Sequence, residues 1–136
     1  MNVMKIDKII EEYRSGALVE TKEVNPKDEL DLLNAFERLE GRNCSSMIFL
    51  LSNETCLVVG GGGGGLYSLF ISIDVDEQLF TLLDPKKSSD EYVDLIVGGQ
   101  MGSYPSNQCV NAELAKAAIL YFAKNGTPDP NLSWEE

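Results

Sequence analysis

The amino-acid sequence predicts an α+β fold: an antiparallel sheet of about five strands with helices packed on one face. Two stretches, 25–40 and 111–125, repeat apolar residues at helical spacing, whereas the intervening 46–98 consists of short apolar or alternating runs typical of strands. The connections between these runs are too short for the crossovers of a parallel sheet, which favours antiparallel pairing. The length of 136 residues fits a single domain spanning 1–136.

The first 25 residues carry few positional signals. Residues 3–14 combine apolar and charged positions at helical spacing, so we expect a short amphipathic helix that ends at Ser15-Gly16. Residues 17–24 are predicted to form a short edge strand. The apolar positions of the expected helix are Ile6, Ile9, Ile10 and Tyr13.

The helix predicted over 25–40 has both of its ends marked. Asn25 suits the N-cap, and Pro26 suits the first helical position, where its missing N–H costs nothing. Gly41 marks the end of the helix. The apolar face consists of residues at i, i+3, i+4 and i+7, which are Leu32, Ala35, Phe36 and Leu39.

The central stretch predicts five strands joined by turns and loops. The first two form a hairpin, and six consecutive glycines, 60–65, lead from the second strand to the third. The third strand alternates in polarity, with Tyr67 on its apolar face. The predicted strands are 47–51, 55–59, 66–73, 79–83 and 92–97; a polar turn at 74–77 and loops at 84–90 and 98–105 complete the stretch.

The last helix is predicted over 111–125. Asn111 caps it, Asn125-Gly126 ends it, and Pro128 prevents the helix from resuming. Its polar stripe is narrow, so we expect the sheet to cover most of its surface. A tail, 126–136, follows and contains the only Trp of the chain, Trp134.

Charge and composition exclude several classes of function. The 22 acidic and 11 basic residues give a net charge of −11 and a pI of about 4.3. Such a surface repels phosphate backbones and attracts basic partners, so we expect no direct nucleic-acid binding. The chain has no His, which removes the commonest general base and metal ligand. We therefore predict no enzyme activity, no cofactor and no metal site.

The cysteines and the apolar runs indicate a soluble protein of the cytoplasm. Cys44, Cys56 and Cys109 are odd in number and widely spaced, which favours free thiols in a reducing compartment over disulfides or a zinc site. We expect no signal peptide, because charges follow the N-terminal Met1, and no membrane span, because the apolar runs are too short.

The glycine run is open to three interpretations. A phosphate-binding loop is disfavoured, because a strand follows the run and 43–85 contains neither Lys nor Arg. The second interpretation is a flexible hairpin tip or bulge that bends two strands. The third is a partner-binding loop, because glycines leave backbone groups open to close approach. For the third we select Gly61, Gly62, Gly63 and Gly64.

The turn after the third strand contains Asp74, Asp76 and Glu77. A solvated turn is the ordinary interpretation. A calcium site is disfavoured because the required ligand spacing is missing, and paired-carboxylate catalysis because nothing places these groups in a pocket. A landing surface for a basic protein, beside the glycine loop, fits the overall charge better.

Two further aromatic residues are candidate contacts. Tyr104 lies in the predicted loop 98–105, where an amphipathic ring can anchor an interface. Trp134 lies in a polar tail, and either packs across the end of the sheet or contributes to a binding surface.

The ordered set of these features resembles the first-numbered family of bacterial immunity proteins, also called deaminase-inhibitor immunity proteins of polymorphic toxin systems. The resemblance runs from about residue 30 to residue 136. It is carried by Leu57-Val58-Val59 with Gly60 to Gly65, Ile96-Val97-Gly98-Gly99-Gln100, Tyr104-Pro105, Val110, Phe122-Ala123-Lys124-Asn125-Gly126, Pro128 and Trp134.

The resemblance implies an α+β protein that binds and blocks the toxic domain of a secreted effector in the cytoplasm of the producing cell. Such toxins are often nucleic-acid deaminases and sometimes nucleases, whose basic surfaces an acidic inhibitor would complement. The alternative is a non-inhibitory adaptor or chaperone for a secreted effector. A small-ligand enzyme or sensor is the least supported hypothesis. The expected contacts are Gly61 to Gly64, Tyr67, Asp74, Asp76, Glu77, Tyr104 and Trp134.

Overall fold

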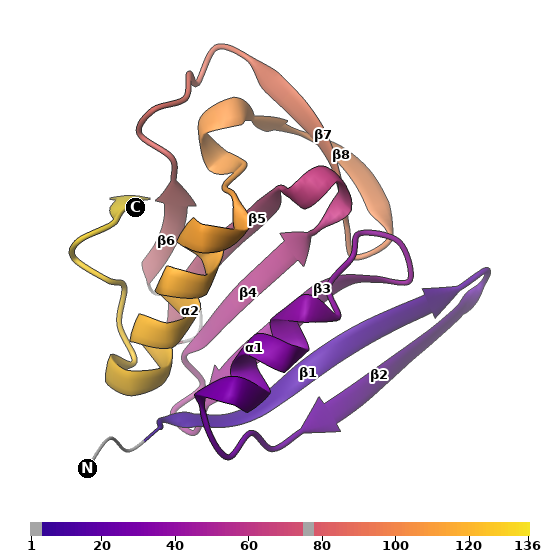
Figure 1. The fold of residues 1–136 in the computed structure, drawn as a ribbon, viewed down its shortest axis with the longest axis vertical. Helices are drawn as coiled ribbons and strands as arrows, with labels where there is room; N and C mark the ends of the chain where they lie inside the picture. Colours follow the sequence, from indigo (N-terminus) through magenta and orange to yellow (C-terminus); the bar gives the residue numbers. More distant parts are fainter. Residues whose placement is uncertain (1–3, 75–77) are drawn as a thin grey trace.

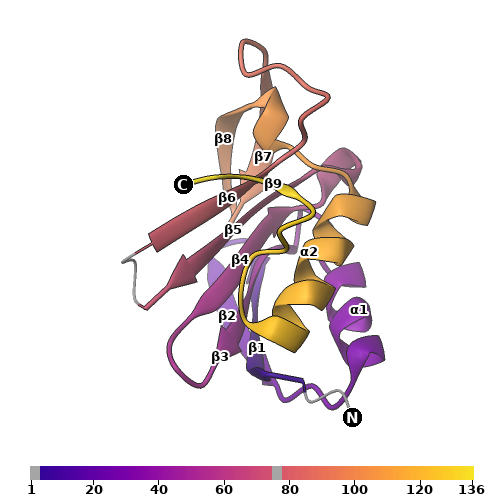
Figure 2. The same ribbon diagram turned by 90° about the vertical axis from the view of Figure 1, so that its left-hand side faces the viewer.

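Two helices pack on one face of a long antiparallel sheet (Figures 1 and 2). The computed structural model describes residues 4–74 and 78–136. The predicted α+β class is confirmed, with more strands than expected, because seven strands form the main sheet and two form a second sheet. The main sheet has the order β2-β1-β3-β4-β5-β6-β9. Its strands are β1 (Ile6–Ser15), β2 (Leu18–Val24), β3 (Cys44–Leu51), β4 (Cys56–Gly61), β5 (Tyr67–Ile73), β6 (Gln78–Leu83) and β9 (Ser133–Glu135).

The N-terminal segment is a strand, so the helix predicted over 3–14 is wrong. β1 pairs with both β2 and β3, and its register against β3 shifts between Ile6 and Lys8. This irregularity turns Ile6 and Ile9, three residues apart, toward the same buried layer. The bulge therefore gives a strand the apolar spacing of a helix. The edge strand predicted over 17–24 is confirmed as β2.

The first helix, α1 (Glu29–Glu37), is shorter than the predicted 25–40. Its N-cap is Asp28, whose carboxylate accepts a hydrogen bond from the backbone N–H of Asp31 at 3.0 Å. Asn25 instead donates from its side chain to the carbonyl of Asp7 at 3.1 Å and so ties the approach to the helix to β1. Asp28 supplies the same capping chemistry three residues later.

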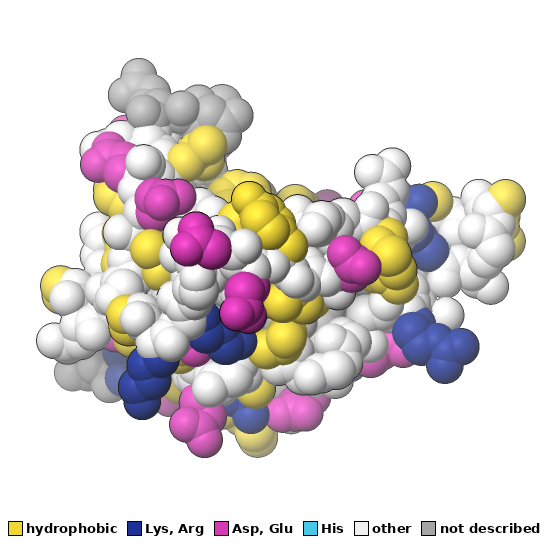
Figure 3. Space-filling view, turned by 90° about the horizontal axis from the view of Figure 1, so that it is seen from above, with side chains coloured by type: hydrophobic (Ala, Val, Ile, Leu, Met, Phe, Trp, Pro, Cys, Tyr) yellow, Lys and Arg dark blue, Asp and Glu magenta, His cyan; other side chains and the backbone are white. Residues whose placement is uncertain are grey.

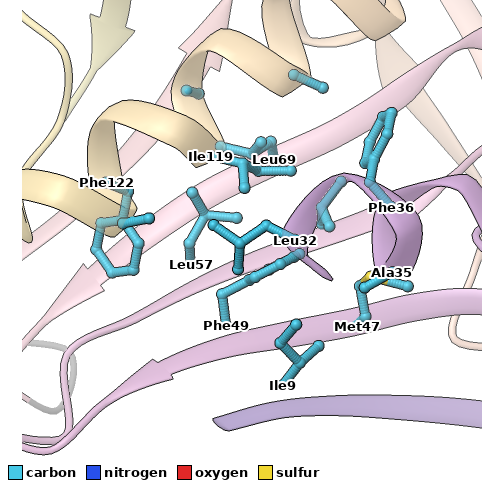
Figure 4. Close-up of a cluster of buried hydrophobic side chains, with 14 of the residues drawn as sticks. Ile9, Leu32, Ala35, Phe36, Met47, Phe49, Leu57, Leu69, Ile119 and Phe122 are labelled. Carbon is cyan, nitrogen blue, oxygen red and sulfur yellow. The ribbon is translucent and has the colours of Figure 1, made fainter. Parts of the chain in front are cut away.

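The core lies between the helices and the sheet (Figure 4). The predicted 3.6-residue face of α1 is buried through Leu32, Ala35 and Phe36. The strands contribute alternate residues, among them Phe49 of β3 and Leu57 of β4, which are fully buried. The predicted hairpin of these two strands is confirmed by antiparallel pairing, with Phe49 opposite Leu57.

The second helix, α2 (Ala112–Asn125), agrees with the prediction at both ends. Asn111 accepts a hydrogen bond from the N–H of Leu114 at 2.9 Å, and Gly126 ends the helix in the left-handed conformation, with φ of 72°. In the described part of the chain, neither helix combines the length and the apolar character that crossing a bilayer requires.

Residues 92–105 depart most from the prediction. Tyr92–Val97 is a strand, β7, but it does not join the main sheet, and the expected loop 98–105 contains a further strand, β8 (Gln100–Pro105). The two strands form a separate hairpin across Gly98 and Gly99, both of which have positive φ. A two-residue turn of this kind is favoured in hairpins, and glycine adopts it without strain.

The β7–β8 hairpin lies against the face of the sheet that carries no helix (Figure 2). A Cβ on Gly60 would lie 2.4 Å from Cγ1 of Val97, so glycine is required where β7 crosses β4. The backbone N–H groups of Gly98 and Gly99 donate to the carbonyl and hydroxyl oxygens of Ser45, at 3.3 and 2.8 Å. These contacts fix the hairpin on the sheet.

Candidate partner-binding surface

The glycine run divides into a packed half and an exposed half. Gly61 belongs to β4, and a Cβ on Gly62 would lie 2.7 Å from the carbonyl oxygen of Leu39. A short 3-10 turn, Gly63–Gly65, then projects into open space, where an added Cβ would meet nothing within 4 Å. The run therefore connects β4 to β5 as a tight turn. This geometry agrees with the hairpin-tip interpretation. The partner-binding interpretation stays a prediction.

The glycine run also explains Gly41, which the sequence suggested only as a helix end. A Cβ on Gly41 would lie 2.4 Å from the backbone nitrogen of Gly63. The loop after α1 and the glycine turn therefore touch backbone to backbone, at the end of the sheet where β3 begins and β4 ends. Only glycine allows this approach.

The acidic turn lies at the other end of β5. Asp74 is exposed and follows the last residue of that strand, whereas Asp76 and Glu77 lie outside the described residues. β5 has seven residues, which corresponds to about 20 Å of extended chain. The expectation that the glycine loop lies beside the acidic turn is therefore wrong, because β5 separates the two.

The aromatic candidates have three different environments. Tyr67 is only 8% exposed; its ring centroid lies 4.7 Å from that of Phe36, and burial raises the pKa of its hydroxyl. Tyr104 is half-buried on β8, opposite Val93. Trp134 is half-buried on β9, opposite Leu82, and packs against the core.

Two tail contacts account for the position of Trp134. Its indole Nε1–H donates to the carbonyl of Asp129 at 2.8 Å, and the backbone of β9 pairs with the outer edge of β6. The tail thereby becomes the last strand of the main sheet. This arrangement agrees with the interpretation in which the tryptophan ties down the tail.

A buried ion pair joins β1 to the end of α1. Glu11 is 1% exposed, and its two carboxylate oxygens accept hydrogen bonds from Nε and a terminal nitrogen of Arg38, at 2.9 and 2.7 Å. The hydroxyl of Tyr13 donates to the same carboxylate. Burial alone would raise the pKa of Glu11, but the hydrogen bonds from Arg38 and Tyr13 outweigh it, and the pKa falls below its ordinary value.

The same contacts raise the pKa values of the two partners of Glu11, which are Tyr13 and Arg38. Burial and the hydrogen bond to Glu11 raise the pKa of Tyr13 to about 12, and the hydrogen bond to Glu11 raises the pKa of Arg38. The cluster therefore holds one negative and one positive charge at neutral pH. The ion pair between Glu11 and Arg38 therefore holds β1 against the end of α1. Sequence reasoning did not find it, because the two residues are 27 positions apart.

The thiols and carboxylates of the described residues show no ligand geometry. Within residues 4–74 and 78–136, no group of three or more Cys, Asp or Glu side chains is placed to hold a metal ion. Cys44, Cys56 and Cys109 form no disulfide among the described residues. Burial raises the pKa of the Cys44 thiol to about 11 and raises that of Cys109 as well, so both stay protonated near neutrality.

The outward face of the β7–β8 hairpin carries exposed side chains that the sequence interpretation did not select. Because strand residues alternate, Leu95 and Val97 face the body of the protein, whereas Tyr92 and Asp94 face outward. Across the hairpin, Met101 of β8 lies on the same outward side. The signal that could have found them is Gly98-Gly99 directly after the run 92–97, because a Gly-Gly pair is typical of a two-residue hairpin turn.

The surface at this end of the molecule mixes acidic, hydrophobic and basic side chains (Figure 3). Tyr92 is 63% and Met101 68% exposed, and Asp90, Glu91 and Asp94 are exposed near them. Of the candidates chosen from the sequence, Tyr104 lies on this hairpin, and the glycine turn lies at the same end of the sheet. Asp74 and Trp134 lie elsewhere on the sheet.

The chain matches the model of a known protein family. The model of a family described as immunity protein Imm1 matches residues 20–136. No curated protein and no solved structure matches the chain. The matched range begins within β2, includes every later element and leaves out β1.

Proposed function

The chain belongs to the Imm1 family of immunity proteins, and on that premise we propose that it inhibits a cognate secreted toxin by covering the toxin's active site. Membership in an immunity family implies that the chain binds a cognate toxin, and it favours a role in binding over a role in catalysis. We propose further that the toxin is a nucleic-acid deaminase or a nuclease and that the two proteins meet in the cytoplasm of the producing cell.

The family match over residues 20–136 carries this proposal, and the net charge supports its finer part. An enzyme that holds nucleic acid needs a basic surface for the phosphates. A chain with a net charge of −11 is attracted to such a surface over a distance set by the ionic strength, which speeds the encounter. An acidic inhibitor can therefore occupy the surface that the substrate would use.

The test is co-expression with the toxin domain encoded beside this chain. Cells that produce the toxin alone should die, and cells that produce both proteins should survive and yield a complex in size-exclusion chromatography. A matched control uses the same toxin with a non-cognate acidic protein of similar size, so that charge alone does not explain survival.

Two failures of this test have different meanings. Death of the cells although both proteins are soluble, together with no complex, would contradict the proposal. A complex whose toxin keeps its full activity would instead support a non-inhibitory adaptor or chaperone. Activity of the purified toxin, measured with and without this protein, separates the two cases.

A further inference from the structure

We propose that the outward face of the β7–β8 hairpin is the surface that docks on a basic face of the cognate toxin. Tyr92 and Met101 are its apolar anchors, and Asp90, Glu91 and Asp94 are its charged contacts. This inference rests on the proposed function and adds to it the part of the chain that makes the contact.

The first argument is exposure. The two anchor side chains, on adjacent strands, are among the most exposed large apolar residues of the described chain, at 63% and 68%. On this outward strip Ile96 lies directly opposite Met101 and Pro105 opposite Tyr92, and the Asp94–Ser103 pair separates the two apolar pairs. Tyrosine and methionine are enriched at protein interfaces, where a large or adaptable apolar side chain gains most from burial. Such a strip on a small separate sheet is typical of a contact surface.

The second argument is charge. Asp90, Glu91 and Asp94 are exposed, and the stretch 88–115 contains no Lys or Arg. The ion pairs found within residues 4–74 and 78–136 involve none of these three carboxylates. Their charge is therefore available to a partner, and a partner that matches it carries Lys or Arg around an apolar centre.

The third argument is rigidity. Ser45 receives hydrogen bonds from both glycines of the hairpin turn, and the N–H of Ser106 donates to the carbonyl of Glu91 at 2.7 Å at the other end. Val97, the residue before the turn, is held close against Gly60. A surface that is already ordered loses little conformational entropy on binding, which favours tight association.

The β1–β2 hairpin is the nearest competitor and differs in charge. Leu18 and Val19 are 67% and 50% exposed at its end. Nearby charges have both signs, because Arg14 lies opposite Val19 and pairs with Glu12 at 2.9 Å, and Glu20 follows Val19 along β2. This hairpin therefore offers apolar surface without the uncompensated negative charge, which makes it a matched control for the β7–β8 hairpin.

The experiment measures binding to the cognate toxin domain, inactivated by substitution so that it can be purified. The variants are Y92A/M101A and D90N/E91Q/D94N, and the control is L18A/V19A; thermal unfolding verifies that each keeps its fold. We expect the first variant to raise Kd by about 30-fold, as for two moderate hot-spot residues. We expect the second to lower the association rate by about 10-fold at low salt and by much less at high salt. The control should stay within about 2-fold.

The outcomes distinguish this inference from the proposed function. Binding by the wild type, with unchanged Kd for both hairpin variants, would overturn the docking surface and leave the immunity function intact. Loss of binding in L18A/V19A alone would assign the contact to the β1–β2 hairpin and overturn the inference as well. No binding by the wild type would overturn both proposals.

Discussion

Removing Arg38 should leave a carboxylate buried without its counter-charge. In the variant R38L, Glu11 loses two hydrogen bonds of 2.9 and 2.7 Å and keeps only the one from Tyr13. Breaking a buried ion pair on one side costs about 3–5 kcal/mol of unfolding free energy. Because the side chain of Arg38 is 43% exposed, water screens part of the interaction, and we expect about 3 kcal/mol, the lower end of that range.

The shifted pKa of Glu11 also predicts how the stability difference between R38L and the wild type changes with pH. In the wild type the pKa of Glu11 lies below its ordinary value of 4.5, so its stabilisation is complete above pH 4.5 and is lost as the pH falls further. In R38L burial dominates and raises that pKa, so the penalty develops as the pH rises above 4.5. The difference in stability should therefore be largest at neutral pH and should shrink as the pH falls through 4.5 and below.

The assay is urea unfolding followed by tryptophan fluorescence at several pH values. The double variant E11L/R38L is the control, because it removes both charges and leaves leucines among apolar neighbours of the core. It should recover most of the lost stability. Equal stability of R38L and the wild type at pH 7 would refute this account of the Glu11–Arg38 ion pair. A difference in the free energy of unfolding that stays constant from pH 7 down to pH 4 would refute it as well.

Three further predictions concern the packing of the backbone and the tail. G60A should cost about 1–3 kcal/mol, because its Cβ would overlap Val97, and V97A should relieve the overlap in a double-mutant cycle; independent effects would contradict this. G63A should change the free energy of unfolding by less than about 0.5 kcal/mol. G62A should cost about 2 kcal/mol or more, because Gly62 has a φ of 104° and its added Cβ would meet a backbone carbonyl. Similar shifts in melting temperature for the two variants would refute this difference. W134A should lower the free energy of unfolding by about 2 kcal/mol and increase amide exchange in β6, and unchanged exchange would contradict the role of the tail.

The elements that could be predicted are those whose signals lie within the element itself. The second helix is correct at both ends, because Asn111 and Gly126 act through the backbone of their immediate neighbours. The β3–β4 hairpin follows from two short apolar runs on either side of a polar turn, and β5 follows from alternation in polarity. The first helix is right in its apolar face and wrong in its start, because Asp28 and Asn25 are both suitable caps.

The elements that could not be predicted depend on distant partners. The helical spacing in the first segment arises from a bulge against β3, which no local pattern reveals. The β8 strand contains two weak strand formers, Gly102 and Pro105, and owes its place to pairing with β7. That hairpin in turn needs Gly60, more than thirty positions earlier, to reach the sheet.

The candidate site likewise has features that the sequence alone predicts and features that depend on the fold. The total charge and the family resemblance depend on the sequence alone, and the family is confirmed by the match over 20–136. The grouping of residues depends on topology, and β5 separates the glycine turn from Asp74. Tyr67 was chosen as a contact and is a core residue at 8% exposure, whereas Tyr92 was not chosen and is 63% exposed.

Inhibition of the purified cognate toxin by this protein tests the central claim most directly. The toxin's activity on its own substrate is measured as the protein is added, at low and at high salt. We predict that activity falls to the background in proportion to the complex formed, and that inhibition needs more protein at high salt. Full toxin activity in a saturated complex would contradict the claim that this chain confers immunity by covering the active site.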